Sequence, residues 1–252
     1  MQPGPMTTCP DVRVRGLSVA FGSLPVLADV SLTVAAGEFV AVVGPSGCGK
    51  STLLRVLGGL LPSGAHVRAD ELSLPVGAGG RAATAWMPQG DSLLPWRRAW
   101  TNVLVGARIA RLPEPVAEAR ARALFDEFGL AGFERSWPHE LSGGMRQRVA
   151  LARTCLPQRP VLLLDEPFGA LDALTRRRLN AWLASVSLGT AGGASAAVVL
   201  VTHDVDEALL LADRVLVMSE RPGRVVLEVH PRSDPSARTR VLEALGVEVV
   251  AT

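Results

Sequence analysis

The 252-residue sequence has few cysteines, little net charge and no recognisable leader segment. Its three cysteines, Cys9, Cys48 and Cys155, lie far apart, so their spacing fits neither a disulfide framework nor a zinc site and favours a reducing compartment. The net charge of +2 is too small to indicate nucleic-acid binding. The N-terminus lacks a basic region followed by an apolar run, so no secretory signal is expected.

One uncharged stretch, Leu179–Thr202, is long enough to cross a bilayer. Its middle, residues 189–195, consists of small and polar residues that are typical of a loop. The stretch is therefore predicted to be a helix end, a loop and a strand at Ala196–Val201. Any membrane role is then expected to come through a partner.

What the sequence does contain is a phosphate-binding loop at Gly44–Thr52. The loop reads GPSGCGKST and matches the pattern G-x-x-x-x-G-K-[ST] at every fixed position. Its glycines let backbone N–H groups converge on an anion, and the positive end of the following helix adds to that site. Lys50 is expected to contact the β- and γ-phosphates, and the Ser51 hydroxyl to contact Mg²⁺. Residues 38–43 and 51–57 predict the strand and the helix that this motif requires.

Residues 140–147 predict a second helix start that can bind phosphate. Ser142 is a good N-cap, and Gly143 and Gly144 leave the backbone N–H groups open. An ordinary capped helix is the alternative interpretation, but a second anion site suits a chain that already has one.

Carboxylates follow a continuous apolar run at Val161–Glu166, which predicts a central parallel strand buried on both faces. Ligands bind at the carboxyl ends of such strands. Asp165 is expected to reach Mg²⁺ through water, and Glu166 to polarise the attacking water as a general base. His203 follows a second such strand and is expected to contact the γ-phosphate or to orient water. Gln89 ends a predicted strand at 84–89 and is expected to face Mg²⁺ or the attacking water.

Two aromatic features have alternative interpretations. Phe21, upstream of the phosphate loop, either stacks on an adenine ring or packs in the core. Leu93–Trp96, together with Trp100, forms either a local core cluster or a docking surface, because Trp is enriched in interface hot spots.

The remaining pattern predicts an α/β fold. Strands are expected near residues 12–15 and 26–34, with a short edge strand at 71–76. Residues 101–129 predict inserted helices. Arg214–Met218 is predicted to be the last strand, followed by a basic, loosely patterned tail.

Together these motifs resemble those of the ATP-binding subunits of ABC transporters, over roughly residues 12–224. The corresponding motifs are Walker A at Gly44–Thr52, the Q-loop at Gln89, the signature at Leu141–Met145, Walker B at Val161–Glu166, the D-loop at Ala170–Asp172 and the H-loop at His203. The sequence departs from the family at Phe21, where Tyr is usual, and at residues 64–85, which match the usual antiparallel arm poorly.

The resemblance implies a P-loop NTPase (RecA-like) core with an N-terminal antiparallel β arm and an inserted α-helical subdomain. A single ABC ATPase domain is expected at residues 10–230. Its core is expected at 10–90 and 157–230, its helical subdomain at 91–156, and tails at 1–9 and 231–252.

The resemblance also implies ATP and Mg²⁺ as cofactors and ATP hydrolysis as the reaction. Glu166, His203 and Gln89 are the implied catalytic residues, and Ser51, Gln89 and Asp165 the implied Mg²⁺ ligands. The residues expected to bind ATP are Phe21, Gly44, Ser46, Gly47, Cys48, Gly49, Lys50, Ser51, Thr52, Ser142, Gly143 and Gly144.

The partners that the resemblance implies are a second ATPase subunit, a membrane permease and, indirectly, a solute-binding protein. The expected ATPase pair is a homodimer, and a heterodimer is the alternative. Two ATP molecules are expected between the subunits, each held by one Walker A and the other signature. Leu93–Trp96 becomes the expected coupling surface. The chain is expected to be peripheral, on the cytoplasmic face of the cell membrane, with no nucleic-acid partner.

A closer resemblance points to importers of the nitrate, sulfonate and taurine group and to their relatives for hydroxymethylpyrimidine thiamine precursors. It is carried by Leu94–Arg97, Asp165–Asp172, Thr202–Ala208 and Arg221–Arg224. The run Met87–Gln89 favours the pyrimidine branch.

Other functions fit the sequence less well. An ABC ATPase acting on DNA would carry a long coiled coil between Lys50 and Ser142, and ribosome-acting relatives usually carry two ATPase modules. A phosphotransferase for small molecules would not need Leu141–Met145. A catalytically silent subunit is disfavoured by the presence of Glu166 and His203.

Overall fold

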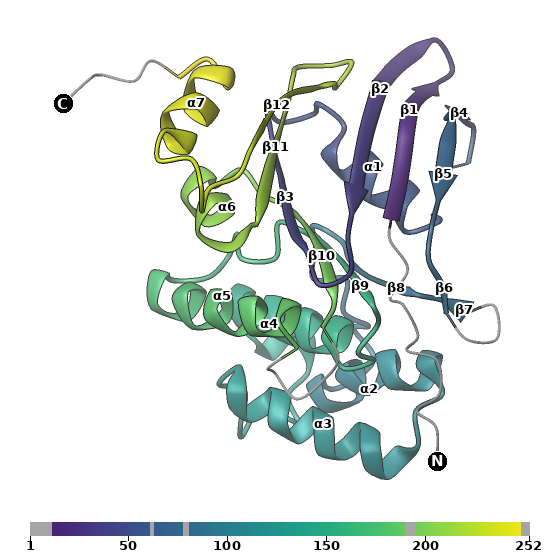
Figure 1. The fold of residues 1–252 in the computed structure, drawn as a ribbon. Coiled ribbons are helices and arrows are strands. Elements are labelled where there is room, and N and C mark those ends of the chain that lie inside the picture. The colour runs from purple at the N-terminus through teal and green to yellow at the C-terminus, as the bar shows by residue number, and fades with distance from the viewer. Residues whose placement is uncertain (1–11, 61–62, 78–80, 190–194, 248–252) are drawn as a thin grey trace, which may run out of the picture.

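A computed structural model describes residues 12–60, 63–77, 81–189 and 195–247. The expected tail at residues 1–9, and residues 190–194 of the predicted loop, lie outside this part of the chain. The fold is α/β, as predicted, and is built on a six-stranded sheet (Figure 1).

The main sheet carries the phosphate loop at the end of one of its inner strands. Its strands lie in the order β12 (Val225–Val229), β11 (Arg214–Met218), β3 (Phe39–Val43), β10 (Ala197–Val201), β9 (Val161–Asp165) and β8 (Thr84–Met87). All neighbours pair in parallel except β12, which is antiparallel to β11. The predicted strands before the phosphate loop, Glu166 and His203 are therefore confirmed as three adjacent parallel strands.

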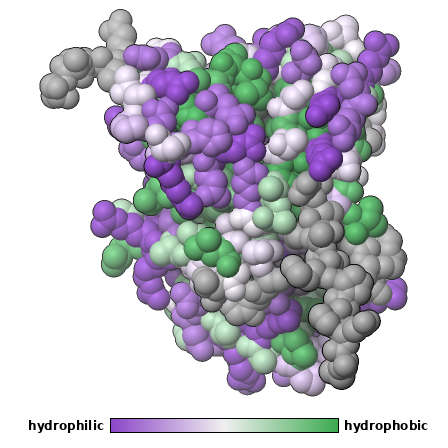
Figure 2. All heavy atoms as spheres, viewed as in Figure 1, coloured by the Kyte–Doolittle hydropathy of each residue, from purple (hydrophilic) through white to green (hydrophobic). Residues whose placement is uncertain are grey.

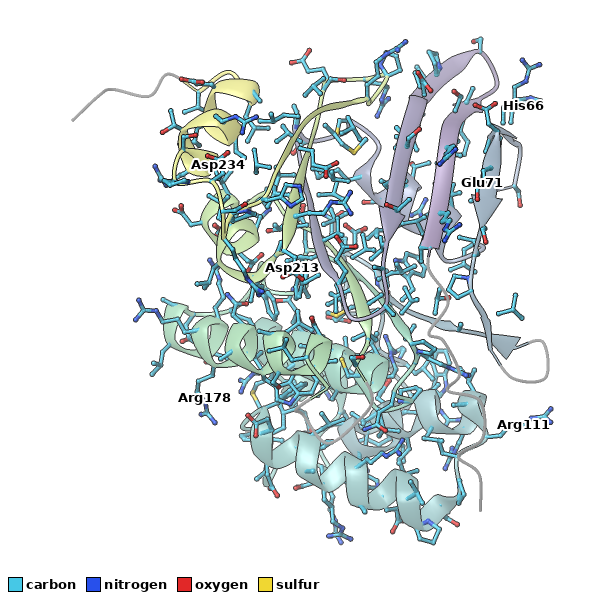
Figure 3. The ribbon with its side chains drawn as sticks, viewed as in Figure 1. His66, Glu71, Arg111, Arg178, Asp213 and Asp234 are labelled. Atoms are coloured by element: carbon cyan, nitrogen blue, oxygen red, sulfur yellow. The ribbon has the colours of Figure 1, made fainter. Side chains whose placement is uncertain are left out.

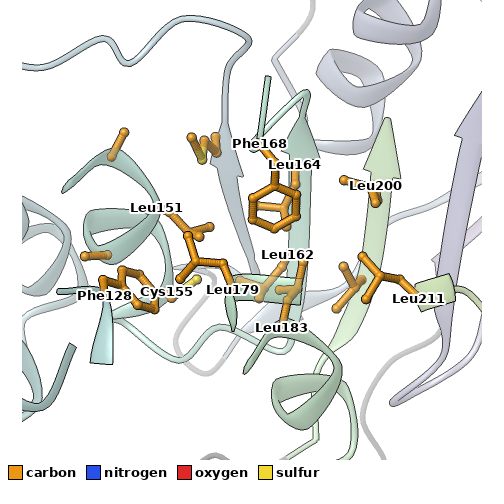
Figure 4. Packing of buried hydrophobic residues seen from close by; sticks show 14 of the residues in the cluster. Phe128, Leu151, Cys155, Leu162, Leu164, Phe168, Leu179, Leu183, Leu200 and Leu211 are labelled. Atoms are coloured by element: carbon orange, nitrogen blue, oxygen red, sulfur yellow. The ribbon is translucent and has the colours of Figure 1, made fainter. Parts of the chain in front are cut away.

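Strands β3, β9 and β10 are apolar throughout because both faces of the sheet are covered. Alternate residues of these strands enter two separate hydrophobic clusters. One cluster contains helix α1 (Lys50–Leu57) and the small β arm, and the other contains most of the remaining helices. Figure 4 shows the second cluster, in which side chains of β9 and β10 meet Leu151, Leu179 and Leu183.

The β arm is an antiparallel sheet on the N-terminal side. Strand β1 (Val12–Phe21) pairs with β2 (Leu24–Val34) on one edge and with β4 (Ala65–Arg68) and β5 (Glu71–Ser73) on the other. Figure 3 labels His66 and Glu71 on these two short strands. The arm thus forms although its second half matched the family pattern poorly. The predicted strand at 71–76 is shorter than expected, because β6 (Val76–Gly77) pairs separately with β7 (Arg81–Ala82).

The inserted helices lie at one end of the molecule (Figure 1). They are α2 (Ala99–Ala110), α3 (Glu114–Glu127), the 3₁₀ turn η2 (Pro138–Glu140) and α4 (Gly143–Cys155). Helix α3 begins with Pro115 in its first turn and is followed by Gly129 at φ +62°, as the sequence predicted. Helix α5 (Ala173–Ser187) runs beside α3, and Arg178 points from α5 toward it (Figure 3), donating to the Glu127 carbonyl oxygen at 3.5 Å.

The prediction that Arg214–Met218 is the last strand is wrong. Strand β12 follows it, and then helix α7 (Ala237–Ala244), which packs against α6 (Val205–Leu211) and β12. Asp213, labelled in Figure 3, accepts a hydrogen bond from the Phe39 N–H at 2.9 Å and pairs with Arg232 at 2.9 Å. The chain after Met218, which was predicted to be a tail, therefore contains a strand and an anchored helix. The sequence missed α7 because only two of its residues, Ala237 and Val241, are buried.

Within the described residues, no helix is both long and apolar enough to span a membrane. On the face drawn in Figure 2, hydrophobic residues form separate patches between hydrophilic ones. The apolar surface seen there is of the scattered kind that folded domains commonly show.

Candidate functional site

The Gly44–Thr52 loop folds around its own lysine. Gly47 and Gly49 have φ values of +77° and +110°, which residues with a Cβ atom rarely adopt. Lys50 is 7% exposed, and its ammonium donates to the carbonyl oxygens of Gly44 at 2.7 Å and Pro45 at 2.9 Å. The loop is thus curled around its lysine, and curled glycine loops of this kind bind phosphate through converging backbone N–H groups.

A turn that sequence reasoning did not connect to ATP supports this loop from outside. The Arg221 guanidinium donates twice to the Gly47 carbonyl oxygen, from Nε at 2.9 Å and from Nη2 at 2.7 Å. A Cβ on Gly223 would lie 2.2 Å from the Cys48 carbonyl oxygen, so only glycine fits there. Gly223 also exchanges backbone hydrogen bonds with Val26 and Ala28 of β2. The phosphate loop is therefore held between β2 and this turn.

Asp165 stands at the end of β9, beside the start of α1, and is 2% exposed. Burial raises the pKa of its carboxyl group, whereas a hydrogen bond with the Ser51 side chain opposes that rise. Its Oδ1 is buried and has no hydrogen-bond partner among the residues that the structure describes. A buried carboxylate oxygen without a partner, beside a serine hydroxyl, suits a hard cation or water bound to one.

Glu166 directly follows Asp165 in the sequence. The structure brings the other two predicted catalytic residues, Gln89 and His203, to its carboxylate. Its Oε2 accepts a hydrogen bond from Gln89 Nε2 at 3.2 Å and lies 3.4 Å from His203 Nδ1. Glu166 has φ +49°, an uncommon value for a residue with a Cβ, and its side chain is 23% exposed. The carboxylate is therefore oriented by groups that follow β8 and β10 while remaining open to water.

The predicted signature forms a capped helix start. The Ser142 hydroxyl accepts a hydrogen bond from the Met145 N–H at 3.2 Å, as an N-cap does. A Cβ on Gly144 would lie 3.0 Å from the Ala170 carbonyl oxygen, so the helix packs closely on the predicted D-loop. Within the described residues, this helix start shares no hydrogen bond with the Gly44–Thr52 loop. The groups closest to Gly143 and Gly144 belong to Ala170, Leu171 and Arg146 rather than to that loop, so the two predicted phosphate sites do not touch there.

Three residues of α4 that sequence reasoning missed connect this helix to its surroundings. Gln147 bonds to the backbone of Glu166 and Ala170. Arg146 pairs with Asp91 at 2.9 Å. Arg153 donates to the carbonyl oxygens of Asp91 at 3.0 Å and Ser92 at 2.8 Å. Helix α4 therefore fixes the segment after Gln89 on one side and the segment after Asp165 on the other.

The two interpretations of Leu93–Trp96 each hold for part of the segment. Leu93 is buried and Trp100 packs on Phe125 with ring centroids 5.4 Å apart, so both belong to the core. Trp96, in contrast, is 69% exposed. The buried Asn102 holds this loop by accepting from the Leu94 N–H and donating to the carbonyl oxygens of Leu94 and Arg97. Trp96 thus projects from a fixed loop.

Phe21 ends β1 and is partly buried against the cluster that contains α1. Its remaining exposure leaves part of the ring accessible, so adenine stacking stays a prediction.

Comparison with known proteins places these motifs in a family. A family model described as ABC transporter matches residues 27–169, more than half of the chain. The chain belongs to the ABC transporter family. It is an ATP-binding subunit, and such subunits are ATPases.

The relatives match nearly the whole chain. The aliphatic sulfonates import ATP-binding protein SsuB 2 of Nocardia farcinica is 47% identical over 95% of this chain and 96% of its own length. A solved structure of an ATP-binding subunit of an ABC transporter covers 94% of this chain and 95% of its own, at TM-score 0.73 and 27% identity. The dimeric, post-hydrolysis cassette MJ0796, bound to ADP and phosphate, covers 88% of this chain and all of its own, at TM-score 0.72 and 28% identity.

Proposed function

We propose that this ABC transporter subunit hydrolyses ATP to energise the import of aliphatic sulfonates through a separate membrane permease. The observation that carries the proposal is the 47% identity to a sulfonate-import ATPase across almost the full length of both chains. The ATPase itself does not touch the transported solute, so its sequence reports the solute by ancestry alone. Met87–Gln89 suggested a pyrimidine solute, whereas the Nocardia farcinica relative is named for the import of aliphatic sulfonates.

The chain's own residues account for nucleotide binding. The N–H groups of the Gly44–Thr52 loop and the N-terminus of α1 surround the phosphates, with Lys50 as the countercharge. Ser51, Asp165 and Gln89 would hold Mg²⁺, which suits the buried, unpartnered Oδ1 of Asp165. Bound Mg²⁺ would neutralise charge on the β- and γ-phosphates.

Glu166 acts on the attacking water as a general base. The hydrogen bond from Gln89 and the nearby His203 ring orient its carboxylate, and its partial exposure leaves room for the water. Because the protein contributes little covalent chemistry to phosphoryl transfer, this positioning supplies most of the catalysis.

Two copies of the chain form the working unit. The separation of the Ser142–Gly144 helix start from the Gly44–Thr52 loop within one chain favours a dimer, in which each ATP lies between the loop of one chain and the signature of the other. The dimeric MJ0796 cassette has the same fold. A solute-binding protein outside the membrane would deliver the sulfonate.

Trp96 is the centre of the surface that contacts the permease. It is a large, exposed aromatic residue on a loop fixed by Asn102, and fixed aromatic residues are typical anchors of interfaces. The loop also follows Gln89, which bonds to the catalytic carboxylate. Permease movement and ATP hydrolysis are thereby linked through a few residues of one segment.

Growth on defined sulfur sources tests the proposed solute. A host strain without this gene should fail to grow with an alkanesulfonate as the only sulfur source but should grow with sulfate. The wild-type gene should restore growth, and the Glu166→Gln gene should not. The deletion strain could instead grow normally on alkanesulfonates and show a defect on nitrate or without thiamine precursors. That result would contradict the sulfonate assignment and indicate another importer group.

A further inference from the structure

Gln147 connects the signature helix to the catalytic segment of the same chain. Its Nε2 donates to the Glu166 carbonyl oxygen at 2.9 Å, and its Oε1 accepts from the Ala170 N–H at 2.8 Å. The residue is 8% exposed. Because both ends of the amide are occupied and shielded from water, the side chain is fixed in one orientation.

The backbone that Gln147 holds is strained. Glu166 has φ +49°, and its own N–H donates to the Val201 carbonyl oxygen at 2.9 Å. The N–H of Glu166 is thus fixed by strand β10, and its carbonyl oxygen by helix α4. Since the two peptide planes set the direction of the Cα–Cβ bond, Gln147 helps to aim the Glu166 carboxylate toward Gln89 and His203.

Gln147 lies about one turn into the helix that starts at Gly143. The helix start packs tightly on the D-loop, because a Cβ on Gly144 would approach the Ala170 carbonyl oxygen to 3.0 Å. A shift of the helix start would therefore move Gln147 and Ala170 with it, since close-packed groups transmit displacement.

We infer that Gln147 is a positioning residue through which nucleotide bound at Ser142–Gly144 aligns Glu166 of the same chain. This inference rests on the proposed dimer, in which the signature and Glu166 of one chain serve different ATP molecules. Gln147 then couples the two ATP sites, so that each site hydrolyses ATP efficiently only when the other is filled.

The test is the variant Gln147→Met, which keeps an unbranched side chain of similar size and removes the amide. ATP turnover of the full-length chain is measured against ATP concentration, and affinity with a fluorescent ATP analogue. We expect kcat to fall about 10-fold, the order that follows from losing a buried hydrogen bond. The ATP concentration at half-maximal rate should change less than about 2-fold, and the Hill coefficient should fall from above 1 to 1.

Thr154→Val is the matched control, because Thr154 is buried on the same helix and its hydroxyl donates to the Ala150 carbonyl oxygen within that helix, at 2.9 Å. It should keep the wild-type kcat and Hill coefficient. The inference is overturned if Gln147→Met keeps wild-type turnover and cooperativity, or if Thr154→Val reproduces its losses. Light scattering of the wild-type chain with ATP distinguishes failure of the Gln147 inference from failure of the proposed dimer. If the chain hydrolyses ATP as a monomer, the dimer itself is contradicted.

Discussion

Gln89 Nε2 donates a hydrogen bond of 3.2 Å to Glu166 Oε2 across 77 positions of sequence. The same oxygen lies 3.4 Å from His203 Nδ1. One carboxylate oxygen therefore contacts two side chains, Gln89 after strand β8 and His203 after strand β10. Gln89 also begins the segment that Arg146 and Arg153 attach to α4. The carboxylate is thus connected, through Gln89 and one backbone segment, to the loop that carries Trp96.

Lys50→Ala should weaken ATP binding roughly 10- to 100-fold, because hydrogen bonds to charged groups are worth about 1.5–3 kcal/mol. Lys50 is the only lysine in the sequence, so no neighbouring lysine can substitute for it. Titration with a fluorescent ATP analogue measures the effect. Arg68→Ala, on the exposed edge of the arm, is the control and should bind as the wild type does. An unchanged affinity in Lys50→Ala would refute the placement of its ammonium on the phosphates.

Arg221→Ala should raise the KM for ATP about 3- to 10-fold with kcat nearly unchanged, because it removes an exposed, charge-assisted support of the Gly47 carbonyl. Arg221→Lys should restore part of the loss. Arg224→Ala changes an exposed arginine in the same turn and should have no effect. If Arg224→Ala raised KM as much as Arg221→Ala does, a general disturbance of the turn would be the cause. The measurement is steady-state ATP hydrolysis.

The elements that could be predicted from the sequence are those defined by residues close together in the chain. The phosphate loop, the capped signature helix and the strands before Glu166 and His203 each consist of a short run of residues with its own turn or period. Their meeting at one edge followed from the rule that parallel strands end together. Strand β12 was missed although its sequence, VVLEV, is apolar at alternate positions, because it is only five residues long and only Val229 is fully buried.

Contacts between distant residues were not predictable in this way. Gln147 and Arg221 are ordinary polar residues by type, and their partners lie 19, 23 and 174 positions away. Likewise, the division of Leu93–Trp96 into a buried Leu93 and an exposed Trp96 depends on how α2 packs, which the local sequence does not encode.

Glu207→Gln should stabilise the chain at neutral pH. Glu207 is 6% exposed, and its burial is the main cause that raises its pKa. The nearby Asp204 adds to the rise. A hydrogen bond from Thr202 and the charges of Arg176 and His203 oppose it. The folded state therefore binds a proton more readily than the unfolded state, and stability from this group is lost as the pH rises through the folded pKa.

Urea unfolding at several pH values measures this effect. The difference in the free energy of unfolding between Glu207→Gln and wild type should be positive at pH 7. It should shrink as the pH falls toward 4.5, the ordinary pKa of the group. A difference that did not vary with pH would show that the Glu207 carboxylate is not destabilised by burial.

Trp96→Ala should reduce co-purification of the permease from detergent-solubilised membranes, because truncating an interface anchor typically costs about 2 kcal/mol or more. ATP affinity should not change, since Trp96 is 69% exposed on a loop that Asn102 fixes and is not among the residues expected to bind ATP. Ile109→Ala, on α2 and 72% exposed, is the control and should retain the permease. Equal recovery of the permease with Trp96→Ala and wild type would exclude Trp96 from the interface.

The most direct test of the account is the Glu166→Gln variant, which keeps the shape of the side chain and removes its basicity. We expect this variant to bind ATP with wild-type affinity, not to turn it over, and to elute as a dimer with ATP and as a monomer without it. Turnover by Glu166→Gln at the wild-type rate would contradict the assignment of Glu166 as the base on which the proposed mechanism depends.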